Sequence, residues 1–409
     1  MNTIIIQNIG TITRIETELA KVNVIIGTQG SGKSTVAKII SYCRWVEKRY
    51  VLDGDCKFDA SERLSMFYRL EEGYFSDNSF FEYRGDYIRL SCSGRELKQT
   101  IAPVGNEFDY RKSKNIYIPA ERSFVSAVPN LGRYNETNDN VMNFVYDWYS
   151  AKRRFTNHNM LPILDLGADF YSNEKTDSDV LFLREKRLEI SLRSGSSGIQ
   201  SLVPLMANVE YLTRSIYDEE ASMSVNETRA LAASFAKPSF AEYARNGNPL
   251  PASPSDAELA MKKTLEDVAA RRKSYHAANL IVEEPEQNLF PRTQRDLIYY
   301  LFNRLQSERE HSLLLTTHSP YILYAVNNCL IGAVIARETT PEERAEFASA
   351  DSWMSPDKVN LLEMDERSGT MRSIKNPRTG TVDKHYFNFA MKEIMQEYYD
   401  MLSFYSDET

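Results

Sequence analysis

Eight residues near the start of the chain have the types and spacing needed to hold a chain of phosphates. They fit the pattern G-x-x-x-x-G-K-[ST] and read Gly27-Thr28-Gln29-Gly30-Ser31-Gly32-Lys33-Ser34. Glycines let backbone N–H groups curl around phosphate oxygens, and the N-terminus of a following helix adds the positive end of its dipole. Lys33 is expected to reach the β- and γ-phosphates, and the Ser34 hydroxyl to bind Mg²⁺. The segment from Gly27 to Thr35 therefore predicts a site for ATP and Mg²⁺.

Paired carboxylates follow a second apolar segment. The run Asn279-Leu280-Ile281-Val282 is typical of a buried strand, and Glu283-Glu284-Pro285-Glu286 comes directly after it. In a phosphate-hydrolysing site one carboxylate completes the metal shell, and another orients or deprotonates the attacking water. We assign Glu283 to the metal, although aspartate is the usual residue there, and Glu284 to the water as a catalytic residue. A strand that merely ends in an acidic turn is the alternative.

A histidine ends a third apolar segment. Leu313-Leu314-Leu315-Thr316-Thr317 predicts a buried strand, and His318-Ser319-Pro320 follows it. A lone histidine is usually a structural residue. His318, however, lies 34 residues after Glu284 and also follows a strand, so we assign it to catalysis as a sensor of the γ-phosphate.

These motifs need a sheet to bring them together. The sequence predicts strands at 4–6, 12–19 and 22–26, a helix at 33–48, hairpins at 79–103, and a strand at 114–119. Strand and helix signals resume at 278–303 and 312–326. Apolar strands that alternate with helices are typical of an α/β fold, so we predict an α/β P-loop nucleoside triphosphatase with an antiparallel N-terminal part.

The composition is that of an ordinary globular protein. Its 409 residues are 42% hydrophobic, its net charge is −8, and it has no apolar run of about 18 residues that would predict a membrane span. The first residues lack the basic flank of a signal peptide, so we expect a cytoplasmic protein. The four cysteines have no metal-ligand spacing, which favours buried free thiols at Cys43, Cys56, Cys92 and Cys329.

Together these motifs resemble the ATP-binding cassette (ABC) class of ATPases, and more closely its soluble OLD-like, RecF-like and SMC-like branch. The matching segments read IIGTQGSGKST, LIVEEPEQNLFP and LLTTHSPYIL, and IYIPAER stands where the branch often has a strand end with proline. The resemblance implies an ABC-ATPase-like mixed sheet with a helical lid and insertions. We divide the chain into an N-terminal part of the ATPase core (1–122), a helical lid (123–179), a signature hairpin and helix (180–216), a polar helical insertion (217–276) and a C-terminal part of the core (277–409).

The glycine- and serine-rich segment at 194–198 takes its meaning from this resemblance. In the ABC class, a signature loop on a second subunit presents a serine and backbone amides to the γ-phosphate. Ser196-Ser197-Gly198-Ile199-Gln200 is similar to that loop. The resemblance thus implies that Ser197, Gly198 and Gln200 bind the nucleotide of a partner, and that the protein forms a homodimer or a higher homo-oligomer. A helix N-cap without a ligand is the alternative.

The resemblance also bears on biological role. OLD-family members commonly carry a nuclease domain after the ATPase, but the segment after His318 lacks a believable cluster of metal-binding carboxylates. The chain is similar to ATPase subunits of two-component anti-phage systems, which implies a separate effector protein such as a nuclease. A RecF-like DNA-repair clamp is the alternative, and a small-molecule kinase is disfavoured because it needs neither the signature nor the histidine.

For an arginine, two basic clusters and a C-terminal helix, the sequence allows more than one interpretation. Arg122 follows a strand end and could touch nucleotide or pair with Glu121. The basic clusters at 152–154 and 271–273 are interpreted as solvated charged faces, with nucleic-acid contact as the alternative. A C-terminal helix at about 384–402 carries an apolar stripe, and we expect that stripe to pack on the core.

Overall fold

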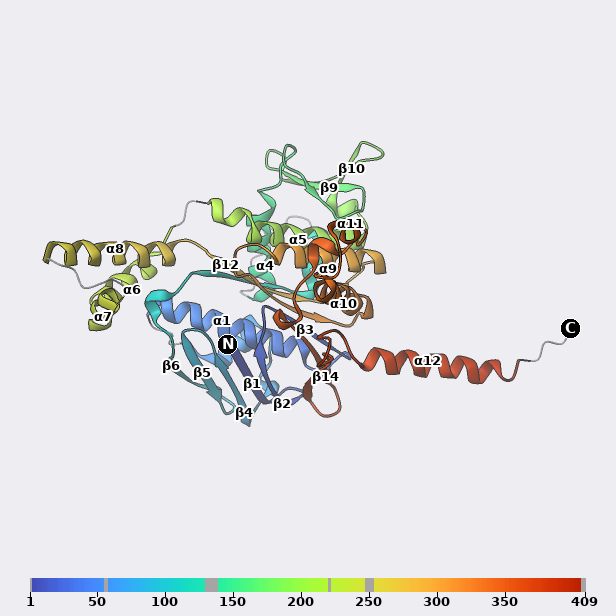
Figure 1. Ribbon diagram of the computed structural model, residues 1–409, viewed down its shortest axis with the longest axis horizontal. Coiled ribbons are helices and arrows are strands. Elements are labelled where there is room, and N and C mark those ends of the chain that lie inside the picture. The colour runs from blue at the N-terminus through green and yellow to red at the C-terminus, as the bar shows by residue number, and fades with distance from the viewer. Residues whose placement is uncertain (1, 55–57, 129–138, 220–221, 247–253, 406–409) are drawn as a thin grey trace.

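The structure is a computed structural model, and it describes residues 2–54, 58–128, 139–219, 222–246 and 254–405. Its centre is an eleven-stranded mixed sheet in the order β6-β5-β4-β1-β2-β15-β14-β3-β13-β12-β7. Helices α4, α5, α9 and α10 cover one face of the parallel strands, and α1 lies on the other face (Figure 1). The α/β class with a P-loop between a strand and a helix is confirmed.

The N-terminal part of the sheet is antiparallel. β1 pairs with both β2 and β4, and β5 lies between β4 and β6. β15, from the C-terminal part of the chain, joins this part to the rest of the sheet by pairing parallel with β2 and antiparallel with β14. The bounds are β1 (Asn2–Ile9), β2 (Ile12–Leu19), β4 (Phe75–Arg84), β5 (Ile88–Ser93), β6 (Lys98–Pro103) and β15 (Thr370–Ser373). The expected hairpins at 4–19 and 79–103 are therefore present.

The remaining strands of this sheet are parallel and form its buried half. They are β3 (Val22–Gly27), β7 (Ser113–Ile118), β12 (Ala277–Glu283), β13 (Ser312–Thr317) and β14 (Val359–Asp365). All six residues of β3 are buried. Alternate side chains of a strand point to opposite faces, so Val24 belongs to the core under α5, and Ile25 belongs to the core around α1. This two-sided burial explains why these strands have continuous apolar sequences.

The helices that pack on these strands are long. Their bounds are α1 (Lys33–Asp53), α4 (Asn140–Lys152), α5 (Ser197–Thr213), α9 (Pro291–Leu305) and α10 (Pro320–Ile335). Short helices α2 (Ala60–Glu62), α3 (Phe124–Ala127) and α11 (Pro341–Ala345) connect larger elements. A proline fits the first turn of α9 and α10, where its missing N–H removes no intrahelical bond.

The helical expectation for 123–179 is wrong in its second half. A separate four-stranded antiparallel sheet starts there, in the order β11-β10-β9-β8. Its strands are β8 (Leu161–Pro162), β9 (Ala168–Asn173), β10 (Ser178–Leu183) and β11 (Leu188–Ser191). Phe170 of β9 packs against Trp148 of α4 with ring centroids 5.5 Å apart. Residues 129–138 lie outside the described part of the chain.

The segment at 217–276 contains α6 (Val225–Phe235), α7 (Pro238–Asn246) and α8 (Pro254–Lys273). These helices extend to one side of the molecule (Figure 1). Phe240 and Val268 share a small apolar cluster with Phe108 of the N-terminal part. The segment therefore has its own small core, separate from the two large ones.

Helix α12 (Tyr386–Leu402) projects away from the rest of the molecule on the opposite side (Figure 1). The expectation that its apolar stripe packs on the core holds only for Phe387 in the first turn and is wrong for the rest of the stripe, which is exposed. Among the described residues, no helix combines the length and apolar character needed to cross a membrane. Cys43, Cys92 and Cys329 are buried free thiols as expected, and Cys56 is outside the described residues.

Candidate nucleotide-binding and hydrolysis site

The three sequence motifs meet at one edge of the sheet. β13 lies between β3 and β12, and all three strands run parallel. Thr317 is aligned with Ile26, and Thr316 is aligned with Glu283. The register therefore places the phosphate-binding loop, His318 and the acidic residues side by side at the carboxyl ends of neighbouring strands.

The loop between β3 and α1 has a conformation that depends on glycine. Gly27 has a φ of +155°, and an added Cβ would lie 2.9 Å from the carbonyl oxygen of Met364. Gly32 has a φ of +96° and is the N-cap of α1, where no side chain accepts a hydrogen bond from the first turn. The first-turn N–H groups of a helix lack intrahelical acceptors, so this N-terminus is suited to bind an anion.

Lys33 is buried and folds back over the loop. Its Nζ donates to the carbonyl oxygens of Gly27 (2.9 Å) and Thr28 (2.6 Å) and lies 3.4 Å from Ser31 Oγ. Burial lowers the pKa of Lys33 to about 8, and nearby carboxylates limit that decrease. Neutral carbonyls satisfy the ammonium only in part, so phosphate oxygens are stronger partners for it.

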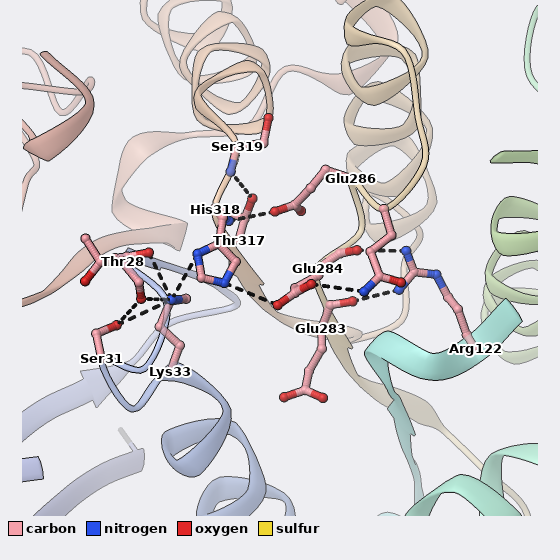
Figure 2. A network of polar contacts seen from close by, with 12 residues as sticks. Thr28, Ser31, Lys33, Arg122, Glu283, Glu284, Glu286, Thr317, His318 and Ser319 are labelled. Carbon is pink, nitrogen blue, oxygen red and sulfur yellow. Dashed lines mark hydrogen bonds and ion pairs between the residues drawn. The ribbon is translucent and has the colours of Figure 1, made fainter. Parts of the chain in front are cut away.

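His318 lies between Lys33 and Glu284 (Figure 2). Its Nδ1 is 3.4 Å from Lys33 Nζ, and its Nε2 is 3.2 Å from Glu284 Oε1. An ammonium can only donate and a carboxylate can only accept, so these partners assign the proton of the neutral imidazole to Nε2. The histidine thus connects the phosphate-binding loop to the first residue after β12.

Glu284 is held in an unusual backbone conformation. Its φ of +42° lies in the left-handed region, which costs a non-glycine residue about 1–3 kcal/mol. The hydrogen bond from His318 and a second one from Gln287 (3.0 Å) lower the pKa of the Glu284 carboxyl to about 2. The carboxylate is therefore an anion with a fixed direction, and the strain indicates that this direction matters.

Glu286 also belongs to the site, although we assigned it no role from the sequence. Its Oε1 accepts the backbone N–H of His318 at 2.6 Å, and its Oε2 is buried without a hydrogen-bond partner. Burial raises the pKa of this carboxyl. Glu286 thus fixes the backbone at His318, as Glu284 fixes the ring.

The Glu283 side chain points away from that of Glu284 (Figure 2). It is 5% exposed, and its Oε1 has no hydrogen-bond partner. Ser34, the other expected ligand, is exposed in the first turn of α1. No group of three or more acidic, histidine or cysteine side chains that could hold a metal occurs among the described residues. A hydroxyl and an orphaned carboxylate oxygen still fit Mg²⁺, which takes one or two protein ligands and otherwise binds water and phosphates.

Arg122 does not pair with Glu121, one of the two contacts weighed from the sequence. It is 1% exposed, and its guanidinium donates to the carbonyl oxygens of Glu283 (2.8 Å) and Glu284 (2.7 Å). Glu121 instead pairs with Arg69 at 3.2 Å. Burial lowers the pKa of Arg122 to about 10. Arg122 therefore holds the backbone of both glutamates from behind the site (Figure 2).

Two further contacts to the loop come from distant parts of the chain. The Thr28 hydroxyl donates to Glu366 Oε2 at 2.6 Å, from the turn between β14 and β15. The Tyr386 hydroxyl, at the start of α12, donates to the Gly27 carbonyl at 3.4 Å. The Tyr386 N–H donates to buried Glu363 at 2.6 Å. Helix α12 is thus attached directly to the phosphate-binding loop.

The expected signature segment forms the N-terminus of α5. Ser196 is the N-cap, and its hydroxyl accepts the N–H of Ile199 at 3.4 Å, while Ser197 is exposed in the first turn. No hydrogen bond between described residues joins Ser197, Gly198 or Gln200 to the loop at 27–35. Within one chain, these two groups of predicted nucleotide ligands are therefore not connected.

Gly198 and Gln200 have contacts within their own chain. A Cβ added to Gly198 would lie 2.7 Å from the carbonyl oxygen of Asn288, so glycine allows α5 to approach the loop after Glu284. The Gln200 amide donates to the carbonyl oxygens of Arg193 (3.0 Å) and Gly195 (2.8 Å). Gln200 thus stabilises the loop before α5.

The interpretation of the basic clusters as solvated faces is wrong for one residue of each, Lys152 and Arg272, whereas Arg153 and Lys273 are exposed as expected. Lys152 is buried and bonds Asp179 at 3.1 Å, and Arg272 is buried and lies 3.4 Å from Glu107. Arg154 pairs with Glu219. These side chains are engaged within the protein, which leaves little of either cluster for a nucleic acid.

Comparison with known proteins identifies no family by sequence, because no protein-family model and no curated protein matches the chain. The solved structures that are similar to it include two SMC head domains and a recombination mediator protein. The SMC head domain from Thermotoga maritima is 13% identical, with a TM-score of 0.36, covering 79% of this chain and 90% of that chain. A second similar structure is the Smc head domain from Pyrococcus furiosus with an extended coiled coil, bound to the C-terminal domain of ScpA. It is 9% identical, with a TM-score of 0.41, covering 97% of this chain and 99% of that chain. The recombination mediator protein RecF of the RecFOR pathway is 11% identical, with a TM-score of 0.32, covering 91% of this chain and 97% of that chain. At these TM-scores the likeness carries no argument about activity.

Proposed function

We propose that this protein binds and hydrolyses ATP with Mg²⁺. The observation that carries the proposal is the chain of contacts from Lys33 to His318 (3.4 Å) and from His318 to Glu284 (3.2 Å), beside the glycine loop. A phosphate-binding loop alone is compatible with binding only. A histidine and an ionised carboxylate next to it supply groups that can sense the γ-phosphate and orient a water.

The residues have separate roles in this proposal. Lys33 exchanges its carbonyl partners for the β- and γ-phosphates, and the first-turn amides of α1 add hydrogen bonds. Ser34 and Glu283 hold Mg²⁺, which neutralises phosphate charge when bound. Glu284 orients the attacking water. Its pKa of about 2 makes it a weak base, so positioning contributes more to its role than proton removal does.

Phosphate release from ATP is the direct test. Purified protein with Mg²⁺ should release inorganic phosphate, and Lys33→Ala should abolish the release by weakening nucleotide binding. A phosphorylated acceptor with no free phosphate would instead identify a kinase. Absence of both products, from folded protein that binds ATP, would leave binding as its only function at this site.

We also propose that ATP is bound between two copies of the chain. The exposed Ser197 at the N-terminus of α5 supports this, because its hydroxyl and the first-turn amides are available to a partner. Lys33→Ala protomers mixed with Ser197→Arg protomers should recover one intact site per heterodimer. No recovery from folded, dimeric variants would indicate that the start of α5 is only a helix cap.

The nucleotide state then controls a separate effector protein, such as a nuclease, in anti-phage defence. The segment at 217–276 is the proposed docking surface, since its helices project to one side and have a core of their own. Residues 218–274 should be replaced by a short Gly/Ser bridge. Phe108→Gln belongs in the same variant, because Phe240 covers the Phe108 ring at 5.1 Å. If this variant hydrolyses ATP and still co-purifies with all native partners, the segment is not the docking surface.

A further inference from the structure

Beyond its first turn, helix α12 has an apolar face that no other part of the described chain buries. Its apolar residues recur at the three- and four-residue spacing of one helix face, at Phe387, Ala390, Met391, Ile394, Met395, Tyr398, Met401 and Leu402. From Met391 onward the large side chains of this face are 41–64% exposed. In proteins most of the stability of a helix comes from packing of its apolar face rather than from helix propensity. This face therefore requires a partner.

The base of α12 is fixed, so its direction is set by the fold. The Tyr386 N–H donates a hydrogen bond to Glu363, and the Tyr386 hydroxyl donates one to the Gly27 carbonyl. His385 is 1% exposed, and its ring lies 6.1 Å from that of Tyr324 in α10. The N–H of Val382 donates to Asn327 of α10 at 2.8 Å. The helix is thus held at its first turn and directed outward (Figure 1).

The polar face of α12 excludes anionic partners. It carries Glu393, Glu397 and Asp400 against a single cation, Lys392. Helices that lie on membranes are rich in lysine and arginine on the polar face, and nucleic-acid contacts need the same charge. The partner is therefore a protein with an apolar surface about as long as the helix.

Helix α10 of the same protein presents such a surface. Its exposed residues recur every three or four positions, at Tyr321, Tyr324, Asn328, Ile331 and Val334. The helix contains no charged residue over its 16 positions. It matches the 17 residues of α12 in length, about 25 Å at 1.5 Å per residue. In one chain α12 leaves from beside α10 and points away from it, so it does not cover this stripe.

We propose that α12 packs on the α10 stripe of a second copy of this chain, and that the second copy returns the same contact. Two-fold symmetry makes such an exchange reciprocal. Two helix contacts of this length bury a surface area on the order of the 1,200–2,000 Å² that is typical of stable interfaces. The interface does not depend on ATP and does not rest on the proposed hydrolysis. α10 follows directly from His318 and α12 starts at Tyr386, so both halves of the contact begin at the candidate site.

The test is the mass of the protein in solution without nucleotide, measured by light scattering. Wild-type protein should have at least twice the 47.0 kDa of one chain. Ile394→Asp on the apolar face of α12 and Ile331→Asp on α10 should each give 47.0 kDa. Gln396→Asp, on the polar face of α12, is the matched control and should keep the wild-type mass. The same series in a Lys33→Ala background excludes assembly driven by ATP.

Mixing the two disruptive variants tests the exchange itself. The intact α12 of an Ile331→Asp chain can pack on the intact α10 of an Ile394→Asp chain. Tagged Ile394→Asp protein should therefore retain untagged Ile331→Asp protein, although neither variant retains itself. A wild-type mass of 47.0 kDa, or an unchanged mass for Ile394→Asp, would overturn the proposal. An Ile331→Asp variant with the wild-type mass would show that α10 is not the surface on which α12 packs.

Discussion

Lys33 Nζ lies 3.4 Å from Nδ1 of His318, so the residue expected to hold phosphate touches the residue expected to sense it. The same ring reaches Glu284 through Nε2 at 3.2 Å. If phosphate draws Lys33 away from its present partners, His318 loses a donor on Nδ1 while its bond to Glu284 remains. In the proposed reaction, His318 is thus the one side chain that contacts both the phosphate-binding lysine and the carboxylate that orients the water.

His318→Ala should lower turnover more than it lowers nucleotide affinity. The ring orients Glu284 and stays close to the phosphate, whereas the loop amides and Lys33 supply most of the binding. We expect kcat to fall about 10²-fold, within the usual range for groups that act on proton transfer or positioning. Steady-state phosphate release and titration with a fluorescent nucleotide measure the two effects. An unchanged kcat would assign His318 a structural role.

Glu284→Gln should retain ATP binding and lose about 10²–10⁴-fold in turnover, because the charge that orients the water is removed. Glu286→Gln is the matched control. Its amide oxygen can still accept the N–H of His318, so most turnover should remain. Rapid hydrolysis by Glu284→Gln, measured in single-turnover experiments, would transfer the role to Glu283 or Glu286.

Nucleotide affinity should fall as the pH rises above about 8. Burial lowers the pKa of Lys33 from 10.5 to about 8 in the protein without nucleotide. Phosphate binding favours the ammonium and raises this pKa again, so binding above pH 8 takes up a proton. Affinity should be constant below that pH and decrease by up to about tenfold per pH unit above it. Titrations at pH 7, 8 and 9 measure the effect, and Lys33→Ala should lack it.

The sequence predicts which three segments lie together because each of them follows a strand end. Apolar runs before Gly27, Glu283 and His318 identify the strands, and the parallel register brings the three positions together. Hydrogen bonds to backbone carbonyl oxygens leave no comparable pattern in the sequence. Arg122 follows a strand end, but the carbonyl oxygens that accept its hydrogen bonds lie 161 and 162 positions away in the sequence. No local pattern identifies a carbonyl as an acceptor.

Two other features could not be predicted for different reasons. The hairpin of β10 and β11 was expected within 180–216, but β8 and β9 of the same sheet were not. β8 has only two residues, which is too short to show alternation within a segment that otherwise resembles a helix. The periodicity of α12 predicts its apolar face correctly. It cannot predict what covers that face, since periodicity contains no information about the partner surface.

Arg122→Met should destabilise the site and the protein together. The substitution keeps much of the buried volume but leaves the carbonyl oxygens of Glu283 and Glu284 without these donors. Each unsatisfied buried acceptor costs about 1–3 kcal/mol. The free energy of unfolding should decrease by no more than the summed cost for these two acceptors. Turnover should fall more than nucleotide affinity. Denaturant unfolding and phosphate release measure both. Stability equal to wild type would contradict the assigned role.

The hydroxyl of Tyr386 links the start of helix α12 to the Gly27 carbonyl of the phosphate-binding loop. Tyr386→Phe removes one hydrogen bond of 3.4 Å, so nucleotide affinity should change by less than about tenfold, as expected for about 1 kcal/mol. Its combination with Ile394→Asp is more informative. If contact between α12 and a second copy influences the loop through this hydroxyl, Ile394→Asp should alter affinity in the wild-type background and much less in the Tyr386→Phe background. A double-mutant cycle on nucleotide affinity measures this coupling, and additive effects would show that α12 and the loop act independently.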